Sequence, residues 1–144
     1  MDQTVILLVD DEKPFVDTMT KRLNKRGFEI HKAFSGPQAL DILNKEATMD
    51  VVILDVKMPE MDGIQTLREI KRAHPLVEVI MLTGHATVET AIEGMRLAAF
   101  DYLMKPCNIE DLVSKVQEAK NKKYQHEQKI IEAKAQAIVL RRGD

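Results

Sequence analysis

Short apolar runs and amphipathic segments alternate along most of the chain. Five apolar runs, rich in β-branched residues, lie at 4–9, 28–33, 51–55, 78–82 and 100–104. Between them, apolar residues recur every three or four positions, the spacing of a helix with one face on a core. Strands that alternate with helices predict a parallel sheet covered by helices on both faces. The runs at 5–9 and 51–54 are apolar throughout and indicate central strands, whereas the run at 28–33 alternates and indicates an edge strand.

Capping residues and helix breakers mark the ends of the intervening helices. Ser35, with a proline in the following turn, and the later Asp62 and Thr87 are expected to cap helix N-termini. Gly27 and Pro75 are expected to end the first and third helices. The local signals therefore agree with the α/β pattern.

The last predicted helix is longer than the others. From about Ile109 to about Leu140 the chain has neither Gly nor Pro, and a helix of that length extends roughly 45 Å, farther than the domain is wide. Its first part has an apolar stripe that faces the core, but residues 117–129 have almost none and are expected to project. We also predict a weak coiled-coil seam in this helix. Tyr124, Ile131 and Ile138 recur every seven positions, and Ala135 lies between the last two. We therefore predict a domain at 1–120 and, at 121–144, a helical extension that dimerises or links domains.

Composition narrows the class of protein. The 144 residues are 44% hydrophobic and 31% charged, with a mean hydropathy of −0.23, as expected for one soluble globular domain. No stretch approaches the roughly 18 apolar residues of a membrane span, and the N-terminus lacks a basic leader, so we expect a cytoplasmic protein with no membrane partner. The single cysteine, Cys107, excludes an internal disulfide and is expected to be structural. Lys and Arg outnumber Asp and Glu by eight to four over residues 115–144, a mixture more typical of a solvated helix face than of a nucleic-acid arm.

Polar residues stand where the predicted strands end. Asp10 and Asp11 follow the first strand, Asp55 ends the third, Thr83 follows the fourth and Lys105 follows the fifth. Doubly wound sheets bind ligands at this edge, and with the strand order 2-1-3-4-5 the relevant strands are successive neighbours about 4.8 Å apart. We therefore expect these five side chains to share one site.

The residue types of this site favour phosphoryl chemistry with a metal ion. Three clustered carboxylates repel one another and either retain protons or bind a cation. Oxygen ligands without histidine or thiol suit Mg²⁺, and a carboxylate such as that of Asp55 is a known nucleophile towards phosphorus. Thr83 can donate a hydrogen bond to a phosphoryl oxygen, and Lys105 can supply a positive charge.

Each of these features alone has a simpler explanation. A doubled aspartate is often a helix cap, Lys-Pro is usually a turn, and a single threonine at a strand end usually has no function. Their joint placement at four strand ends is what favours a functional site.

Three stretches carry a resemblance to a known family. "ILLVDDE", "VVILDVKMPEMDG" and "VIMLTGHATVETAIEGMRLAAFDYLMKP" resemble the receiver domain of two-component response regulators, and the match covers about residues 4–120. The last stretch is most similar to receivers of σ54-dependent activators. The resemblance implies a flavodoxin-like (βα)5 fold.

The resemblance also implies an acceptor and a metal site. Asp55 would accept a phosphoryl group from a histidine kinase. Mg²⁺ would be bound by Asp11, Asp55 and the backbone carbonyl of Lys57, with Asp10 assisting through water. Such a domain is not an enzyme beyond its own phosphorylation and dephosphorylation.

Further roles come from the same resemblance. Thr83 and Lys105 would contact the phosphoryl group, the Lys105–Pro106 bond would be cis, and Tyr102 would be the aromatic switch residue that follows Thr83. One departure from many family members is Cys107, which stands where they carry Phe.

The expected function is a phosphorylation-driven switch. Its output face would comprise the helix around residues 88–95, the strand at 100–104 and the long helix from 109, through which a homodimer would form and control transcription. Direct nucleic-acid binding is not expected, because the five repeats leave no helix-turn-helix, and no ATPase phosphate loop is present. The long C-terminal helix favours a piece of a longer regulator over a stand-alone receiver.

Two other functions compete with this expectation. An aspartyl-phosphate phosphatase uses similar residues, but its dehalogenase-like form needs an Asp-x-Asp pattern that "LVDDE" does not supply. A flavodoxin-like electron carrier is disfavoured because the acidic loop "DDEKP" would repel the FMN phosphate.

Overall fold

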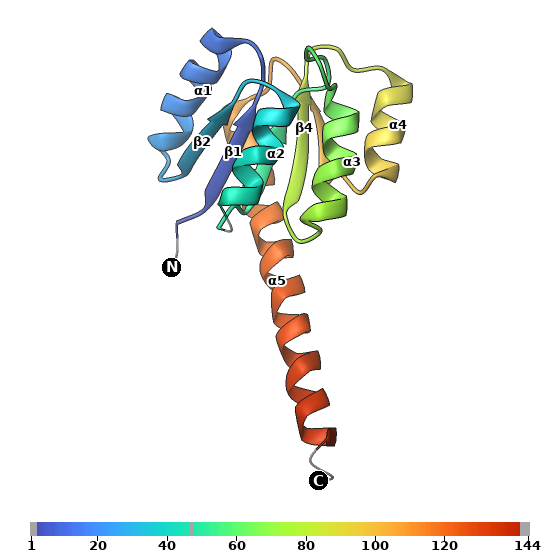
Figure 1. Cartoon of the computed structure of the whole chain (residues 1–144). Helices are drawn as coiled ribbons and strands as arrows, with labels where there is room; N and C mark the ends of the chain where they lie inside the picture. Colours follow the sequence, from blue (N-terminus) through green and yellow to red (C-terminus); the bar gives the residue numbers. More distant parts are fainter. Residues whose placement is uncertain (1–2, 47, 142–144) are drawn as a thin grey trace.

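The sheet has the predicted parallel α/β architecture. A computed structural model describes residues 3–46 and 48–141, and its five parallel strands follow the order β2-β1-β3-β4-β5 (Figure 1). The strands are β1 (Val5–Val9), β2 (Glu29–Ala33), β3 (Val51–Leu54), β4 (Glu78–Thr83) and β5 (Asp101–Met104). The helices are α1 (Lys13–Asn24), α2 (Gly36–Lys45), α3 (Gly63–Ala73), α4 (Val88–Arg96) and α5 (Ile109–Arg141). The predicted fold class and strand order are confirmed.

Two apolar layers enclose the sheet, one on each face. Alternate residues of β1 enter different layers, since successive side chains of a strand point to opposite faces. Leu7 packs in the layer under α2 and α3, whereas Leu8 packs in the layer under α1 and α5. Both faces of the central strands are therefore buried.

Burial follows the predicted order of the strands. Every residue of β1, β3 and β4 is buried, whereas β2, at the edge, has exposed and half-buried positions and one buried residue, Ala33. The other edge strand, β5, is half-buried with an exposed last residue. The fourth strand is one residue longer than predicted, because Thr83 pairs with Met104 and so ends β4.

The predicted caps hold three helix starts in place. The Ser35 hydroxyl accepts from the Gln38 N–H, and both Asp62 and Thr87 form reciprocal capping boxes with the residue three positions later. Gly27, at φ 91°, follows the end of α1, and α3 ends two residues before Pro75. Local sequence therefore decided where these helices start and stop.

Helix α5 runs beneath the sheet and then leaves it, so that the second half stands clear of the body (Figure 1). Ile109, Leu112, Val116 and Ala119 are buried, whereas the predicted seam residues Tyr124, Ile131 and Ile138 are at least half exposed. The expectation that 117–129 projects from the domain was wrong at its start, because Lys120 and Lys123 donate to a buried acid, as described below.

The division into 1–120 and 121–144 stays a prediction, and residues 142–144 lie outside the described residues. None of the described helices has the length and apolar character needed to cross a membrane.

Candidate functional site

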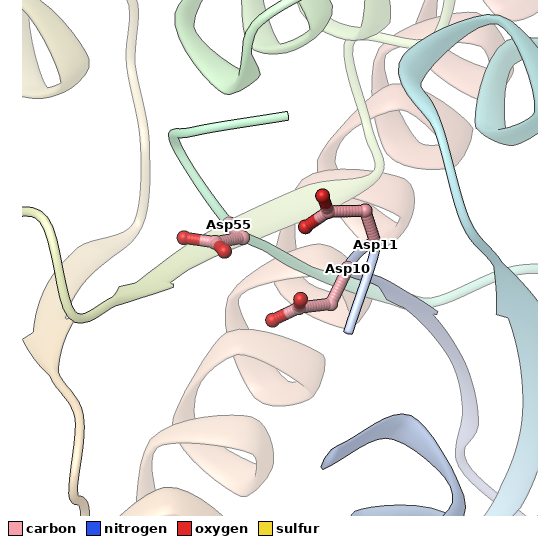
Figure 2. Close-up of side chains that lie close together, drawn as sticks. All are labelled: Asp10, Asp11 and Asp55. Atoms are coloured by element: carbon pink, nitrogen blue, oxygen red, sulfur yellow. The ribbon is translucent and has the colours of Figure 1, made fainter. Parts of the chain in front are cut away.

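The predicted site lies at the carboxyl edge, the edge of the sheet where the parallel strands end. Asp10 follows β1 and Asp55 follows β3, and these strands are direct neighbours in the sheet. Carboxylate oxygens of Asp10, Asp11 and Asp55 lie within 4.8 Å of one another, and Figure 2 shows the three side chains gathered at this edge. The structure therefore brings the three predicted acids together.

Two of the three carboxylates are buried and held by the backbone. Asp10 is 1% exposed and Asp55 is 2% exposed, whereas Asp11 faces solvent. One oxygen of Asp10 accepts from the Glu12 N–H at 2.9 Å, and one oxygen of Asp55 accepts from the Val56 N–H at 2.8 Å. The other oxygen of each buried acid, Oδ2, faces the centre of the site, where Lys105 lies.

Lys105 reaches this centre from the end of β5. Its Nζ donates to Asp10 Oδ2 at 2.6 Å and lies 3.6 Å from Asp55 Oδ2, and the Lys105–Pro106 bond is cis, as predicted. It also donates to Glu12 Oε1 at 3.2 Å, a contact that the sequence analysis did not foresee. The lysine is thus shared among three acids.

The pKa values of Lys105 and Asp10 are both shifted in this site. Burial would lower the pKa of Lys105, but the hydrogen bond to Asp10 and the charges of Asp10 and Asp55 outweigh it and raise the pKa. Burial raises the pKa of Asp10, and the opposing hydrogen bonds from Lys105 and the Glu12 N–H do not cancel that effect. Burial therefore disfavours the ionised form of Asp10 even with Lys105 beside it.

A close approach of α3 fixes the loop after Asp55. The Gly63 N–H donates to the Val56 carbonyl at 2.6 Å, and a Cβ at position 63 would lie 2.0 Å from the Asp55 carbonyl oxygen. Only glycine leaves room for α3 to begin this close to Asp55. Lys57 lies in the same loop with an exposed side chain, and a role for its carbonyl as a metal ligand stays a prediction.

Thr83 and Tyr102 are both present at the β4 and β5 side of the site. Thr83 is fully buried, and its hydroxyl oxygen accepts from the His85 N–H at 3.0 Å. The Tyr102 hydroxyl lies 2.8 Å from the Thr90 hydroxyl, and its ring packs over Gly94 of α4. In this structure Tyr102 therefore contacts α4, through Thr90. The sequence did not predict a role for Thr90, although the residue belongs to the "TVET" capping pattern.

The donor set fits a hard divalent cation. Its three ligand groups are all carboxylates, two buried and one exposed, as suits a metal that keeps some of its waters. Such a cation would offset the repulsion among these carboxylates, whose oxygens lie within 4.8 Å of one another.

Comparison with known proteins decides the family. The model of the response regulator receiver domain matches residues 6–117. The chain belongs to this family. The solved receiver domain of a protein from Clostridium thermocellum has 38% identity and a TM-score of 0.81 over 85% of this chain and 98% of that one. The receiver domain of NtrX from Brucella abortus has 35% identity and a TM-score of 0.75 over 81% of this chain and 98% of that one.

Curated relatives are longer regulators. This receiver is 39% identical over 118 residues to the transcriptional regulatory protein ZraR of Escherichia coli K12, which is 82% of this chain and 26% of that protein. It is 41% identical over 114 residues to the regulatory protein AtoC of the same strain, 79% of this chain and 24% of that protein. These relatives support the predicted likeness to receivers of σ54-dependent activators. The chain spans about a quarter of their length.

Proposed function

We propose that this receiver is a switch in which Asp55 accepts a phosphoryl group from a histidine kinase. The observation that carries the proposal is the position of Asp55, a buried carboxylate whose Oδ2 lies 3.6 Å from the Lys105 ammonium and beside two further carboxylates. Such a group has a nucleophilic oxygen, a nearby positive charge and room for a cation.

The transfer is a displacement at phosphorus. The Asp55 oxygen that faces Lys105 forms the new P–O bond, and the P–N bond to the kinase histidine breaks. The electron pair of that bond stays on the imidazole nitrogen, which takes up a proton from solvent. The other Asp55 oxygen stays bonded to the Val56 N–H, which orients the carboxylate. Lys105 and Thr83 would each contact a phosphoryl oxygen, as a positive charge and a hydroxyl donor respectively.

Mg²⁺ would be held by Asp11, Asp55 and the backbone carbonyl of Lys57, with Asp10 acting through water. When bound, it would neutralise charge on the phosphoryl oxygens. The domain would catalyse only its own phosphorylation and dephosphorylation, in the cytoplasm.

The output would be a population shift on the face formed by α4, β5 and α5. Thr83 would move towards the phosphoryl group and Tyr102 would follow, exchanging its present contact with Thr90. Large apolar side chains already stand exposed on this face and on the extension of α5. They are Val88, Ile92, Met95, Met104, Tyr124, Ile130, Ile131, Ile138, Val139 and Leu140. This apolar surface supports a homodimer whose pairing depends on phosphorylation and controls transcription.

The intact mass of the protein after incubation with a small-molecule phosphodonor tests the acceptor. One added phosphoryl group is expected in the wild type with Mg²⁺, and none without Mg²⁺ or in Asp55→Asn. Asp50→Asn, which changes another buried aspartate far from the site, is the matched control and should still be phosphorylated. No addition to the wild type would overturn the proposal, and sustained turnover of a phosphomonoester would favour a phosphatase instead.

Sedimentation tests the dimer separately. Beryllium fluoride, as a phosphoryl mimic, should raise the sedimentation mass of the wild type but not of Asp55→Asn. An unchanged mass, with unchanged pairing of residues 109–140, would remove dimerisation from the proposal while leaving the acceptor intact.

A further inference from the structure

Lys105 has a partner that is not an acid. Its Nζ lies 4.0 Å from the centroid of the Phe15 ring, which belongs to the first turn of α1. An ammonium at this distance from an aromatic ring is attracted to the negative face of the ring, most strongly where water is excluded. The Lys105 side chain is 14% exposed, so most of its surroundings are protein.

The ring and the carboxylates hold the ammonium from different directions. Asp10, Glu12 and Asp55 supply oxygens at 2.6, 3.2 and 3.6 Å. The ring offers no strong hydrogen-bond acceptor, so it attracts the charge while leaving the three N–H donors for oxygen. A lysine has a flexible four-carbon stem, and it needs such a support if its charge is to stay at one place when the hydrogen-bond partners change.

Phe15 itself is well anchored. It is half-buried and packs against the apolar layer under α1 and α5, and α1 begins with Pro14 in its first turn. The ring is therefore a fixed surface, supplied by a helix that comes directly after the acidic loop.

We propose that Phe15 is a positioning residue for Lys105, holding the ammonium where it can meet the phosphoryl group on Asp55. The proposal rests on the proposed function for its kinetic consequence, but not for its structural one. Phe15 would touch neither phosphorus nor metal, and it would act through the lysine alone.

The structural consequence is measured on the unphosphorylated protein by NMR. A ring face at this distance shifts the Lys105 Hε protons upfield. The upfield shift should be present in the wild type and in Phe15→Tyr, which keeps the ring face, and lost in Phe15→Leu, which keeps an apolar side chain. Phe34→Leu is the matched control, because Phe34 packs in the same layer and has its own lysine, Lys13, at 5.7 Å. That variant should leave the Lys105 signal in place.

The kinetic consequence is the rate of phosphorylation by a small-molecule donor at saturating Mg²⁺. Phe15→Leu should lower the rate roughly tenfold, and Phe15→Tyr should restore it. In a Lys105→Met background, Phe15→Leu should have no further effect, because there is no charge left to position.

The outcomes separate the two proposals. An unchanged Lys105 signal in Phe15→Leu, or an equal loss of rate in the Lys105→Met background, would overturn the role of Phe15. A wild type that is never phosphorylated would overturn the proposed function, while the NMR comparison would still decide whether Phe15 holds the lysine.

Discussion

Both edges of the sheet bury acidic side chains, but the two edges differ in how many lysines contact those acids. Asp10 and Asp55 lie at the carboxyl edge, and Asp50 and Glu78 lie at the amino edge, where the strands begin; each of the four is at most 4% exposed. At the carboxyl edge, one lysine serves both acids and Glu12 as well.

At the amino edge, lysines outnumber the acids. Asp50 accepts from Lys120 at 2.8 Å and from Lys123 at 2.9 Å, while its other oxygen accepts from the Val5 N–H. Glu78 accepts from Lys71 of α3 at 3.1 Å and lies 3.2 Å from Lys122 of α5. Three lysines within one turn of α5, Lys120, Lys122 and Lys123, thus bind the exit of this helix to the base of the sheet.

The pKa values of Asp50 and Asp10 are shifted in opposite directions. Burial would raise the pKa of Asp50, but the hydrogen bonds from Lys120, the Val5 N–H and Lys123 outweigh it and lower the pKa. Burial prevails at Asp10, whose pKa is raised. An acid whose pKa is lowered in the folded state adds stability when it is ionised, whereas an acid whose pKa is raised in a cluster of carboxylates is a candidate for a functional site. Buried acids are therefore expected to serve the structure at the amino edge and, under the proposed function, the chemistry at the carboxyl edge.

Removing Asp50, the acid paired with two lysines, is expected to have the largest effect on the free energy of unfolding. Asp50→Ala leaves two lysines and a buried backbone N–H without their acceptor, and should lower the free energy of unfolding by about 3 kcal/mol. Urea denaturation measures this loss. Asp11→Ala, at the exposed acid of the other edge, should change stability by no more than about 0.5 kcal/mol. Equal losses in the two variants would contradict the contrast between the edges.

Low pH should remove part of the stabilisation that Asp50 contributes to the folded state. Because the folded pKa lies below the unfolded value of about 3.9, the stabilisation by ionised Asp50 is present above that value and is lost as the pH falls through the folded pKa. The gap in unfolding free energy between the wild type and Asp50→Asn should therefore narrow below about pH 4. Denaturation curves from neutral pH down into this range measure it, and a gap that widens towards acid would show that the pKa is not lowered.

Mg²⁺ should stabilise the protein through the carboxyl edge alone. At ten times its dissociation constant, a cation that binds only the folded state adds about 1.4 kcal/mol. The increase should persist in Asp50→Asn and weaken in Asp11→Asn, as measured by the thermal midpoint at increasing Mg²⁺. A response that Asp11→Asn leaves intact would place the cation elsewhere.

The smallest expected effects come from two strained backbone positions, one beside each edge. Glu60, in the loop after β3, has φ 70°, and Ala98, in the loop before β5, has φ 68°, and both side chains are exposed. Glycine at either position should raise the free energy of unfolding by about 0.5–1 kcal/mol, because it adopts this conformation without the clash of a Cβ. Ala98→Gly should also leave the phosphorylation rate unchanged, and a slower rate would show that the amino edge reaches the site.

The sequence was a good guide to features that depend on neighbours in the chain. Periodicity predicted the helices and strands, and Ser35, Asp62 and Thr87 predicted three caps, because these signals act within a few residues. The converging acids were predictable as well, since strand order alone places Asp10 beside Asp55.

The contacts that it missed join residues far apart. Lys120 and Asp50 are 70 residues apart, and Lys105 and Glu12 are 93 apart. Charge in a helix predicts a solvated face, and nothing local to Lys120 indicates which acid it will meet. The same holds for Phe15, whose spacing marks it as a core residue but not as the neighbour of a lysine. Such pairings depend on how the helices pack against the sheet.

The path of α5 has a mechanical consequence. The helix begins just after Lys105 and Pro106, crosses the domain and continues for 18 residues beyond Lys123, which contacts Asp50. This leaves a free arm of about 27 Å. A tilt of about 5° at its base would carry the far end about 2 Å sideways, so a movement too small to disturb the core is enlarged at the end of the arm. The arm works as a lever whose fulcrum is the lysine-bound base of the sheet.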